Sequence, residues 1–187
     1  MDDLQKLMNP VLVKRNLMLA SLYLMAYEML KDTIITKVDD FYRGSSKYGK
    51  LKDSGYEKDV LSLDRNPLLA SCLWFMEAGA ITESDIDDIK NIREHRNKIA
   101  HGLLELLIEP DVNINISYYQ QMRRLLQKLL WWWIVNIECG TNPYLDGIEF
   151  SEGDVKFPLL DLNDYLVDIS LSIADSFPPK GDPFSNN

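Results

Sequence analysis

Apolar residues recur through most of the 187-residue chain at the three- and four-residue spacing that is typical of α-helices. The first such stretch begins at Asn9 and Pro10, because Asn can cap a helix and Pro has no amide to leave unpaired in the first position. No Gly or Pro follows until Gly44, which predicts one long helix or two helices broken near residues 31–33. Apolar side chains surround nearly the whole cylinder between residues 17 and 29, so we expect packing partners on several sides.

Two shorter helices are predicted in the middle of the chain. One begins with Asn66 as its cap, followed by a proline, and stops at Gly79. The other begins at Thr82, where Thr-Glu-Ser-Asp resembles a capping box, and it can continue to Glu109 with Gly102 as a weak point. Three aspartates in its first turns suit the positive end of the helix dipole, and we favour this interpretation over a magnesium site. These aspartates are Asp85, Asp87 and Asp88.

A fourth helix is predicted over residues 114–138, and Gly140 marks its end. It contains three consecutive tryptophans at positions 131–133. Neighbouring side chains on a helix point about 100° apart, so the three rings cannot all face one core. We expect at least one of them to lie in a second interface.

Three further segments lack this periodicity or follow it weakly. Residues 44–58 hold three glycines, two adjacent serines and several lysines, which predicts a basic loop. Residues 147–157 are consistent with a short hairpin, and residues 163–175 with a final helix. The last residues, 177–187, are rich in Pro, Gly and Asn and are expected to form a disordered or loosely attached tail.

These elements together predict an all-α fold, an antiparallel helix bundle of four to five helices with a small C-terminal appendix. The length suits a single compact domain. We therefore assign residues 1–140 to the bundle and residues 141–187 to the appendix, which would hold the hairpin, the last helix and the tail.

Composition narrows the classes of function. The 29 acidic and 20 basic residues give a net charge of −9, which disfavours a protein that coats DNA. The two cysteines, Cys72 and Cys139, lie far apart, so we expect no disulfide framework, no metal knuckle and a reducing, cytoplasmic location. No apolar run approaches the roughly 18 residues of a membrane span, so no membrane partner is expected. P-loops, GxGxxG motifs and serine nucleophile elbows are absent, and no cofactor is expected.

One segment, residues 90–102, has charged and polar residues that packing of a helix bundle does not explain, and it contains both histidines of the chain. On a helical wheel at about 100° per residue, the isoleucines and leucines of the third helix form one buried face, and Arg96 falls in its middle. His95 projects from the opposite edge, and we expect it to be a surface or interface residue. A polar stripe adjoins the apolar face on the other side. Its main members are Lys90, Arg93, Asn97 and His101.

A charged guanidinium on an apolar face costs several kcal/mol unless it has partners. One interpretation is a buried ion pair, with Asp39 or Asp40 as the carboxylate. The other is a polar cleft in which Arg96, Asn97 and His101 converge on an anion. Asn97 and His101 are four residues apart and share one face of the helix.

Arg, Asn and His together suit phosphodiester cleavage without a metal. A histidine can take the proton from an RNA 2′-hydroxyl or donate one to the leaving oxygen, and arginine offers a planar fork of donors to the non-bridging oxygens. One such set supplies a single acid or base, so a two-fold dimer would complete the site. The excess of apolar surface on the first and fourth helices gives that dimer a physical motive.

At these residues the chain resembles a known family. Residues 96–101, Arg-Asn-Lys-Ile-Ala-His, fit the Arg, Asn, three residues, His signature of HEPN domains (higher eukaryotes and prokaryotes nucleotide-binding). The resemblance implies a helical bundle that dimerises into a composite, metal-independent endoribonuclease site, often in toxin–antitoxin, antiphage or RNA-guided systems. By this analogy Arg96 binds phosphate, Asn97 completes the site and His101 is the general acid or base. The subgroup paired with nucleotidyltransferase antitoxins has a Tyr two residues after the His, whereas this chain has Leu103.

The sequence therefore predicts a homodimeric HEPN-type ribonuclease of a defence or toxin–antitoxin system, acting on single-stranded RNA, with an antitoxin or sensor protein as a further partner. Lys90, Arg93 and Lys98 are candidate substrate contacts, and the basic loop would guide RNA to the cleft. The alternative is a non-catalytic HEPN dimer that binds a nucleotide or a protein partner, since not all members of the family cut RNA.

Overall fold

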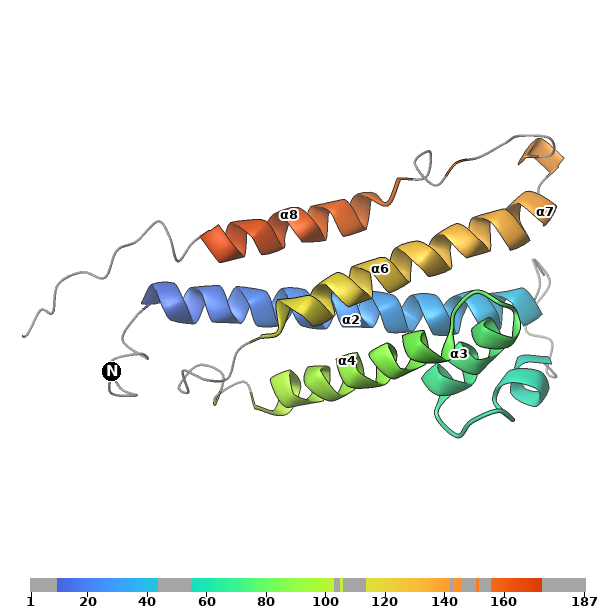
Figure 1. The fold of residues 1–187 in the computed structure, drawn as a ribbon, viewed down its shortest axis with the longest axis horizontal. Coiled ribbons are helices and arrows are strands. Elements are labelled where there is room, and N and C mark those ends of the chain that lie inside the picture. The colour runs from blue at the N-terminus through green and yellow to red at the C-terminus, as the bar shows by residue number, and fades with distance from the viewer. Residues whose placement is uncertain are drawn as a thin grey trace, which may run out of the picture.

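The protein is an all-α helix bundle (Figure 1). Its structure, a computed structural model, describes residues 10–43, 55–102, 105, 114–141, 143–145, 151 and 156–172. These residues form helices and turns and no strand. The elements are α2 (Pro10–Arg43), the π-helical turn η1 (Tyr56–Val60), α3 (Pro67–Glu77), α4 (Glu83–His101), α6 (Ile116–Trp133), the π-helical η2 (Ile134–Glu138), α7 (Cys139–Thr141), the 3-10 turn η3 (Pro143–Leu145) and α8 (Pro158–Ser172).

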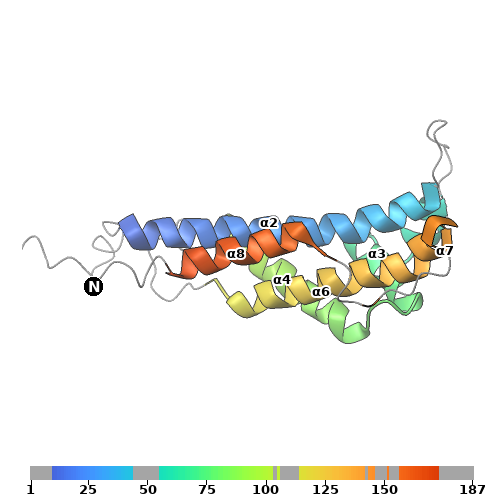
Figure 2. The same cartoon turned by 90° about the horizontal axis from the view of Figure 1, so that it is seen from above.

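The long helices alternate in direction along one axis. Helix α2 runs the length of the bundle, α4 returns beside it, α6 runs forward again and α8 returns on the outside, while the short α3 lies at one end (Figures 1 and 2). Helix α2 packs against α3, α4, α6 and α8. None of the described helices is long and apolar enough to cross a membrane.

The first helix is a single element, which decides between the two predicted alternatives. Its apolar side chains surround the cylinder because the other helices cover it from several sides. Tyr23, Leu30 and Ile34 are each buried to at least 99%. The Tyr23 hydroxyl also donates a buried hydrogen bond to the Ile92 carbonyl of α4 at 3.1 Å, so α2 anchors both the core and the backbone of its neighbour.

Both predicted helix starts in the middle of the chain are confirmed. The Asn66 side chain accepts a hydrogen bond from the Leu68 amide at 3.0 Å. Thr82 and Asp85 form the capping box, in which the Thr82 hydroxyl accepts from the Asp85 amide and the Asp85 carboxylate accepts from the Thr82 amide. Gly79 follows α3 with a φ of 78°, a left-handed conformation that favours glycine.

Most of the predicted continuation to Glu109 lies outside the described residues, but α4 itself ends at His101, next to the predicted weak point. Gly102 caps it, and its amide donates to the Lys98 carbonyl at 2.8 Å. A Cβ atom at Gly102 would lie 2.8 Å from the same carbonyl oxygen, so this close approach requires glycine. The glycine is therefore the end of the helix and places His101 in its last turn.

The fourth predicted helix consists of α6 and its π-helical continuation η2. Trp133 is buried and its ring contacts Phe75 of α3, with ring centres 6.2 Å apart. Trp132 packs edge-on against the same phenylalanine at 5.8 Å. Trp131 is half-buried, and the second interface expected for one of the three rings stays a prediction.

The less regular segments differ in part from expectation. The end of the predicted loop, residues 56–58, belongs to η1, because Tyr56 and Val60 are buried against the bundle. The predicted final helix begins earlier, at Pro158. Helix α8 also shares the bundle core through Leu160 and Val167, although the sequence assigned it to the appendix. Most of the predicted hairpin and all of the predicted tail lie outside the described residues.

Candidate functional site

A cavity of about 340 Å³ opens between α2, the start of α3 and α4. Three side chains of α4 reach it, Arg93, Arg96 and Asn97, and residues 66–68 form the wall at the start of α3. Helix α2 contributes four more side chains to the lining. They are Tyr27, Glu28, Lys31 and Ile35.

Arg96 is the central polar group of this cavity. Its Nη2 donates to Glu28 Oε1 at 3.0 Å, and its Nη1 lies 3.4 Å from Asn97 Oδ1. The guanidinium carbon is 5.5 Å from the centre of the Tyr27 ring, within the range of a cation–π interaction. Its Nε is buried and has no hydrogen-bond partner within the described part of the chain. The guanidinium therefore has one strong partner and spare donor capacity.

The predicted ion pair of Arg96 exists, but its carboxylate is neither Asp39 nor Asp40. Asp39 is engaged by Arg43, whose Nη2 lies 2.7 Å from Asp39 Oδ2. Arg96 pairs with Glu28 instead, because Glu28 lies about three turns before Asp39 on α2 and is therefore beside Arg96. The Arg96 side chain is also 31% exposed and therefore not sealed in the core.

The cavity has an excess of positive charge. Lys31 forms an ion pair with the second carboxylate oxygen of Glu28. The hydrogen bond from Lys31 lowers the pKa of Glu28, burial opposes this effect and the hydrogen bond from Arg96 adds to it. Glu28 is thus charged at neutral pH, and it stands against three cationic side chains, Lys31, Arg93 and Arg96. Such a balance in a concave site attracts anions.

The structure brings together some of the predicted site residues and separates others. Arg93, Arg96 and Asn97 meet in the cavity. His101 is exposed on the last turn of α4 and is not part of the lining as far as the structure describes it. Lys90 pairs with Asp87 on the surface at 2.9 Å, and Lys98 is exposed. Neither lysine is among the described lining residues.

The other histidine has a structural role. His95 is half-buried, and its ring packs edge-on against Tyr23, with ring centres 5.0 Å apart. It also lies at a tilt against the Tyr118 ring at 5.2 Å. Its Nε2 accepts a hydrogen bond from the Asn115 amide at 3.1 Å. Burial lowers the pKa of His95, and nearby Lys98 lowers it further. His95 thus joins α4 to the start of α6 within one chain, at a partly exposed position.

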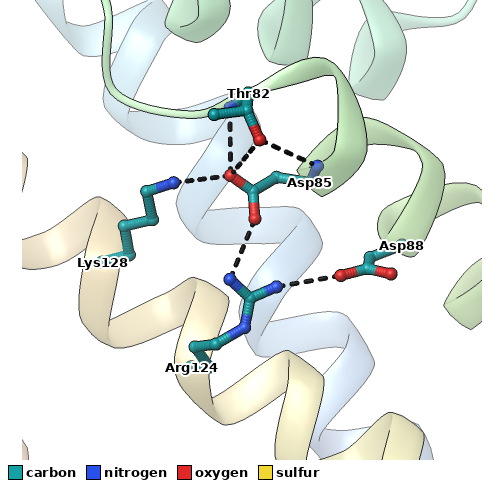
Figure 3. A network of polar contacts seen from close by, with 5 residues as sticks. All are labelled: Thr82, Asp85, Asp88, Arg124 and Lys128. Atoms are coloured by element: carbon teal, nitrogen blue, oxygen red, sulfur yellow. Dashed lines mark hydrogen bonds and ion pairs between the residues drawn. The ribbon is translucent and has the colours of Figure 1, made fainter.

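The aspartates at the start of α4 form a structural network (Figure 3). Asp85 is 3% exposed and accepts hydrogen bonds from Thr82, Arg124 and Lys128. Burial raises its pKa, but the hydrogen bonds from Lys128, Thr82 and Arg124 outweigh burial and lower it to about 2. Asp88 binds the same arginine at 2.9 Å. The network clamps α4 to α6, and no group of described side chains is placed to hold a metal ion.

Sequence reasoning missed the contribution of α2 to the cavity. Glu28 and Lys31 are three residues apart, so their ion pair was predictable from spacing alone. Their position opposite Arg96 was not, because it depends on the register of two helices whose paired residues lie 68 positions apart in the sequence.

Comparison of the chain with protein-family models, curated proteins and solved structures found no match. The resemblance to HEPN domains therefore depends on residues 96–101 and their place on a helix of an all-α bundle.

Proposed function

We propose that the cavity binds a phosphate of single-stranded RNA and that the protein is a metal-independent endoribonuclease of the HEPN type, acting as a homodimer. The observation that carries this proposal is the convergence of Arg93, Arg96 and Lys31 in one cavity. An RNA phosphate between its neighbouring nucleosides is an anion that fits such a set of donors.

The proposed reaction is internal transesterification. The 2′-oxygen attacks phosphorus, the bond to the 5′-oxygen breaks, and the products are a 2′,3′-cyclic phosphate and a 5′-hydroxyl. One group takes the proton from the 2′-hydroxyl and another protonates the leaving 5′-oxygen. Arg96 would stabilise the charge that develops on the non-bridging oxygens, with Arg93 and Asn97 beside it. His101 would move a proton.

A second copy of the chain is required by this scheme. His101 lies five residues after Arg96, about 7 Å further along α4 and beyond the cavity. Its exposed position allows the imidazole to serve a site shared with another protomer, and two protomers supply the two proton-transfer groups that the reaction uses.

Cleavage in a chelator tests the proposal. Labelled single-stranded RNA is incubated with the protein in EDTA, beside His101→Ala and Arg96→Ala. We expect cleavage, and a loss of about 100-fold or more in either variant. Arg43→Ala is the matched control, because Arg43 pairs with Asp39 on the surface at the far end of α2. Unchanged cleavage in His101→Ala would contradict the proposed chemistry.

Binding is measured separately with 2′-O-methyl RNA, which cannot undergo this reaction. Arg93→Ala should weaken binding and reduce its salt dependence by about one counterion, whereas Arg43→Ala should not. Circular dichroism and sedimentation show whether each variant remains a folded dimer.

A second candidate function is binding of a nucleotide or RNA without turnover. The observation that favours it is that Glu28 already holds Arg96, while His101 lies outside the cavity. In this case the protein binds 2′-O-methyl RNA or a mononucleotide through Arg93 and Arg96, and unmodified RNA stays intact.

The proposed setting is a defence or toxin–antitoxin system of the cytoplasm, with an antitoxin or sensor protein as partner. Expression in bacterial cells should then arrest growth, and the His101→Ala variant should not. Growth arrest by both the native chain and His101→Ala would show that the toxicity does not come from the proposed RNA cleavage.

A further inference from the structure

Helix α8 carries its larger apolar side chains on the outside of the bundle. Leu159 is 68% exposed, Leu162 is 53% exposed and Tyr165 is 63% exposed. We call these three residues the α8 outer stripe. Their spacing of three residues places them along one face of the helix. Figures 1 and 2 show α8 on the outside of the bundle, running along α2.

The inner face of α8 is less apolar than the outer stripe. The buried positions are Leu160, Asn163, Val167 and Ser170, so two of the four are polar. Leu166 and Leu171 are partly buried and also pack against the core. Both polar atoms of the Asn163 amide are buried without a hydrogen-bond partner in the described part of the structure. A helix that served only this bundle would turn its apolar stripe inward, because burial of an unpaired amide costs free energy. The composition of α8 therefore indicates a second packing surface.

The edge of the outer stripe is acidic. Asp161 and Asp168 are both exposed, and their spacing of seven residues places them on the same edge, about 10 Å apart. The 15 residues of α8 include no lysine or arginine. Asp164 faces α6, where Tyr119 and Arg123 bind it. The same arginine lies 3.8 Å from Asp161, whose side chain stays 64% exposed, so Asp161 shares a cation with Asp164. The outer stripe thus lies beside carboxylates that no residue of its own helix neutralises.

We propose that the α8 outer stripe binds a cationic amphipathic helix of a partner protein. Apolar residues of the partner at positions i, i+3 and i+7 would cover Leu159, Leu162 and Tyr165. Lysine or arginine side chains one heptad apart would pair with Asp161 and Asp168. The proposal uses no residue of the cavity and is independent of RNA binding.

The acidic edge of the stripe favours a cationic helix over a second copy of the chain. Pairing of two α8 helices would bring carboxylates of like charge together at one edge, and α8 has no lysine or arginine to offset them. Like charges across an interface oppose association, whereas a basic helix gains from both the apolar contact and the acidic edge.

The probe is a synthetic helical peptide of leucine and lysine in heptads, labelled for fluorescence anisotropy, with the full-length protein as the receptor. We expect saturable binding that weakens as salt rises. A leucine–glutamate peptide of the same pattern should bind at least about ten-fold more weakly, because it repeats the charge of the helix.

Variants on the exposed face locate the peptide without disturbing the core. Leu162→Ser and Tyr165→Ser together should weaken binding by about ten-fold or more, since apolar and aromatic anchors dominate such interfaces. Asp168→Asn should weaken it less and reduce its salt dependence. Val135→Ser is the control, because Val135 is also an exposed apolar residue, at 43%, but lies in η2 at the other end of the bundle.

Two results would overturn the proposal. One is peptide binding that is absent or unaffected by the paired substitutions. The other is sedimentation in which Leu162→Ser with Tyr165→Ser converts a dimer into monomers, because the face would then belong to a second copy of this chain. Loss of peptide binding alone leaves RNA cleavage and RNA binding unchanged, because the α8 outer stripe shares no residue with the cavity.

Discussion

The Glu28 carboxylate accepts a hydrogen bond from the Arg96 guanidinium at 3.0 Å, across the contact between α2 and α4. This pair decides how Arg96 can act. An anion that enters the cavity either shares the guanidinium with Glu28 or displaces the carboxylate, so the affinity of the cavity for phosphate depends on a residue that carries the opposite charge.

Glu28→Gln should raise the affinity for 2′-O-methyl RNA by several-fold. The amide keeps a hydrogen-bond acceptor for Arg96 but removes the negative charge that competes with phosphate. The free energy of unfolding should fall by less than about 1 kcal/mol, because the carboxylate is 39% exposed and such pairs contribute little. Anisotropy measures the affinity and urea unfolding measures the stability. Weaker RNA binding would contradict the assignment of the cavity as an anion site.

Asp85→Asn should destabilise the protein by about 2 kcal/mol at neutral pH, because the folded state holds the pKa of this carboxyl well below its ordinary value. The folded state lowers the pKa of Asp85 to about 2, so this stabilisation is present above the ordinary pKa of Asp, near 4, and is lost as the pH falls toward about 2. The variant should therefore show a flatter dependence of stability on pH in that window. Urea unfolding at several pH values measures both effects.

Asp88→Asn is the control for this experiment. Asp88 also binds Arg124, but its side chain is 27% exposed, whereas that of Asp85 is 5% exposed. An equal loss in both variants would show that burial of Asp85 contributes nothing to the clamp.

Acidification should also lower the stability that the neutral His95 ring gives to the folded state. Because the pKa of His95 is lowered in the folded state, the unfolded chain binds a proton more readily. The stabilisation is complete above the ordinary imidazole pKa, near about 6.5, and falls as the pH drops through and below it. His95→Phe keeps the ring contacts with Tyr23 and Tyr118 but has no acceptor for the Asn115 amide. Thermal unfolding between pH 7 and 5 should show a smaller decline for this variant than for the native chain.

Asn163→Leu should stabilise the protein by about 1–3 kcal/mol. The residue is 1% exposed and neither polar atom of its amide has a partner in the described structure, so an apolar side chain of similar size removes a desolvation penalty. The midpoint of urea unfolding should rise. A clear loss of stability would mean that the amide has a partner, such as a buried water.

Local chemistry explains which parts of the fold were predictable. The starts of α3 and α4 depend on side chains two or three residues from the amides that they cap, as at Asn66 and Thr82, so the sequence pattern predicts them directly. The end of α4 at Gly102 was predicted only as a weak point, because apolar periodicity continues beyond His101. The helix ends where Gly102 comes close to a carbonyl of the preceding turn, and apolar periodicity does not predict such an approach.

The candidate site was predictable in its residue types but not in its arrangement. The position of Arg96 on an apolar face predicted a compensating partner, and a carboxylate was one of the two alternatives. Glu28 is that carboxylate. Which carboxylate pairs with Arg96 depends on the register between α2 and α4, that is, on which turn of α2 lies beside Arg96. The spacing of residues along a single helix does not specify this register. For the same reason the wheel grouped Asn97 with His101, whereas the cavity groups Asn97 with Arg96.

Because α2 touches α3, α4, α6 and α8, transient detachment of any one of them leaves it enclosed by the rest. Its central turns, around the fully buried Leu30, Ile34 and Val38, can meet solvent only when the whole bundle comes apart. Amide protons there should exchange with deuterium last in the molecule, on the timescale of global unfolding, while those of the peripheral α8 exchange much sooner.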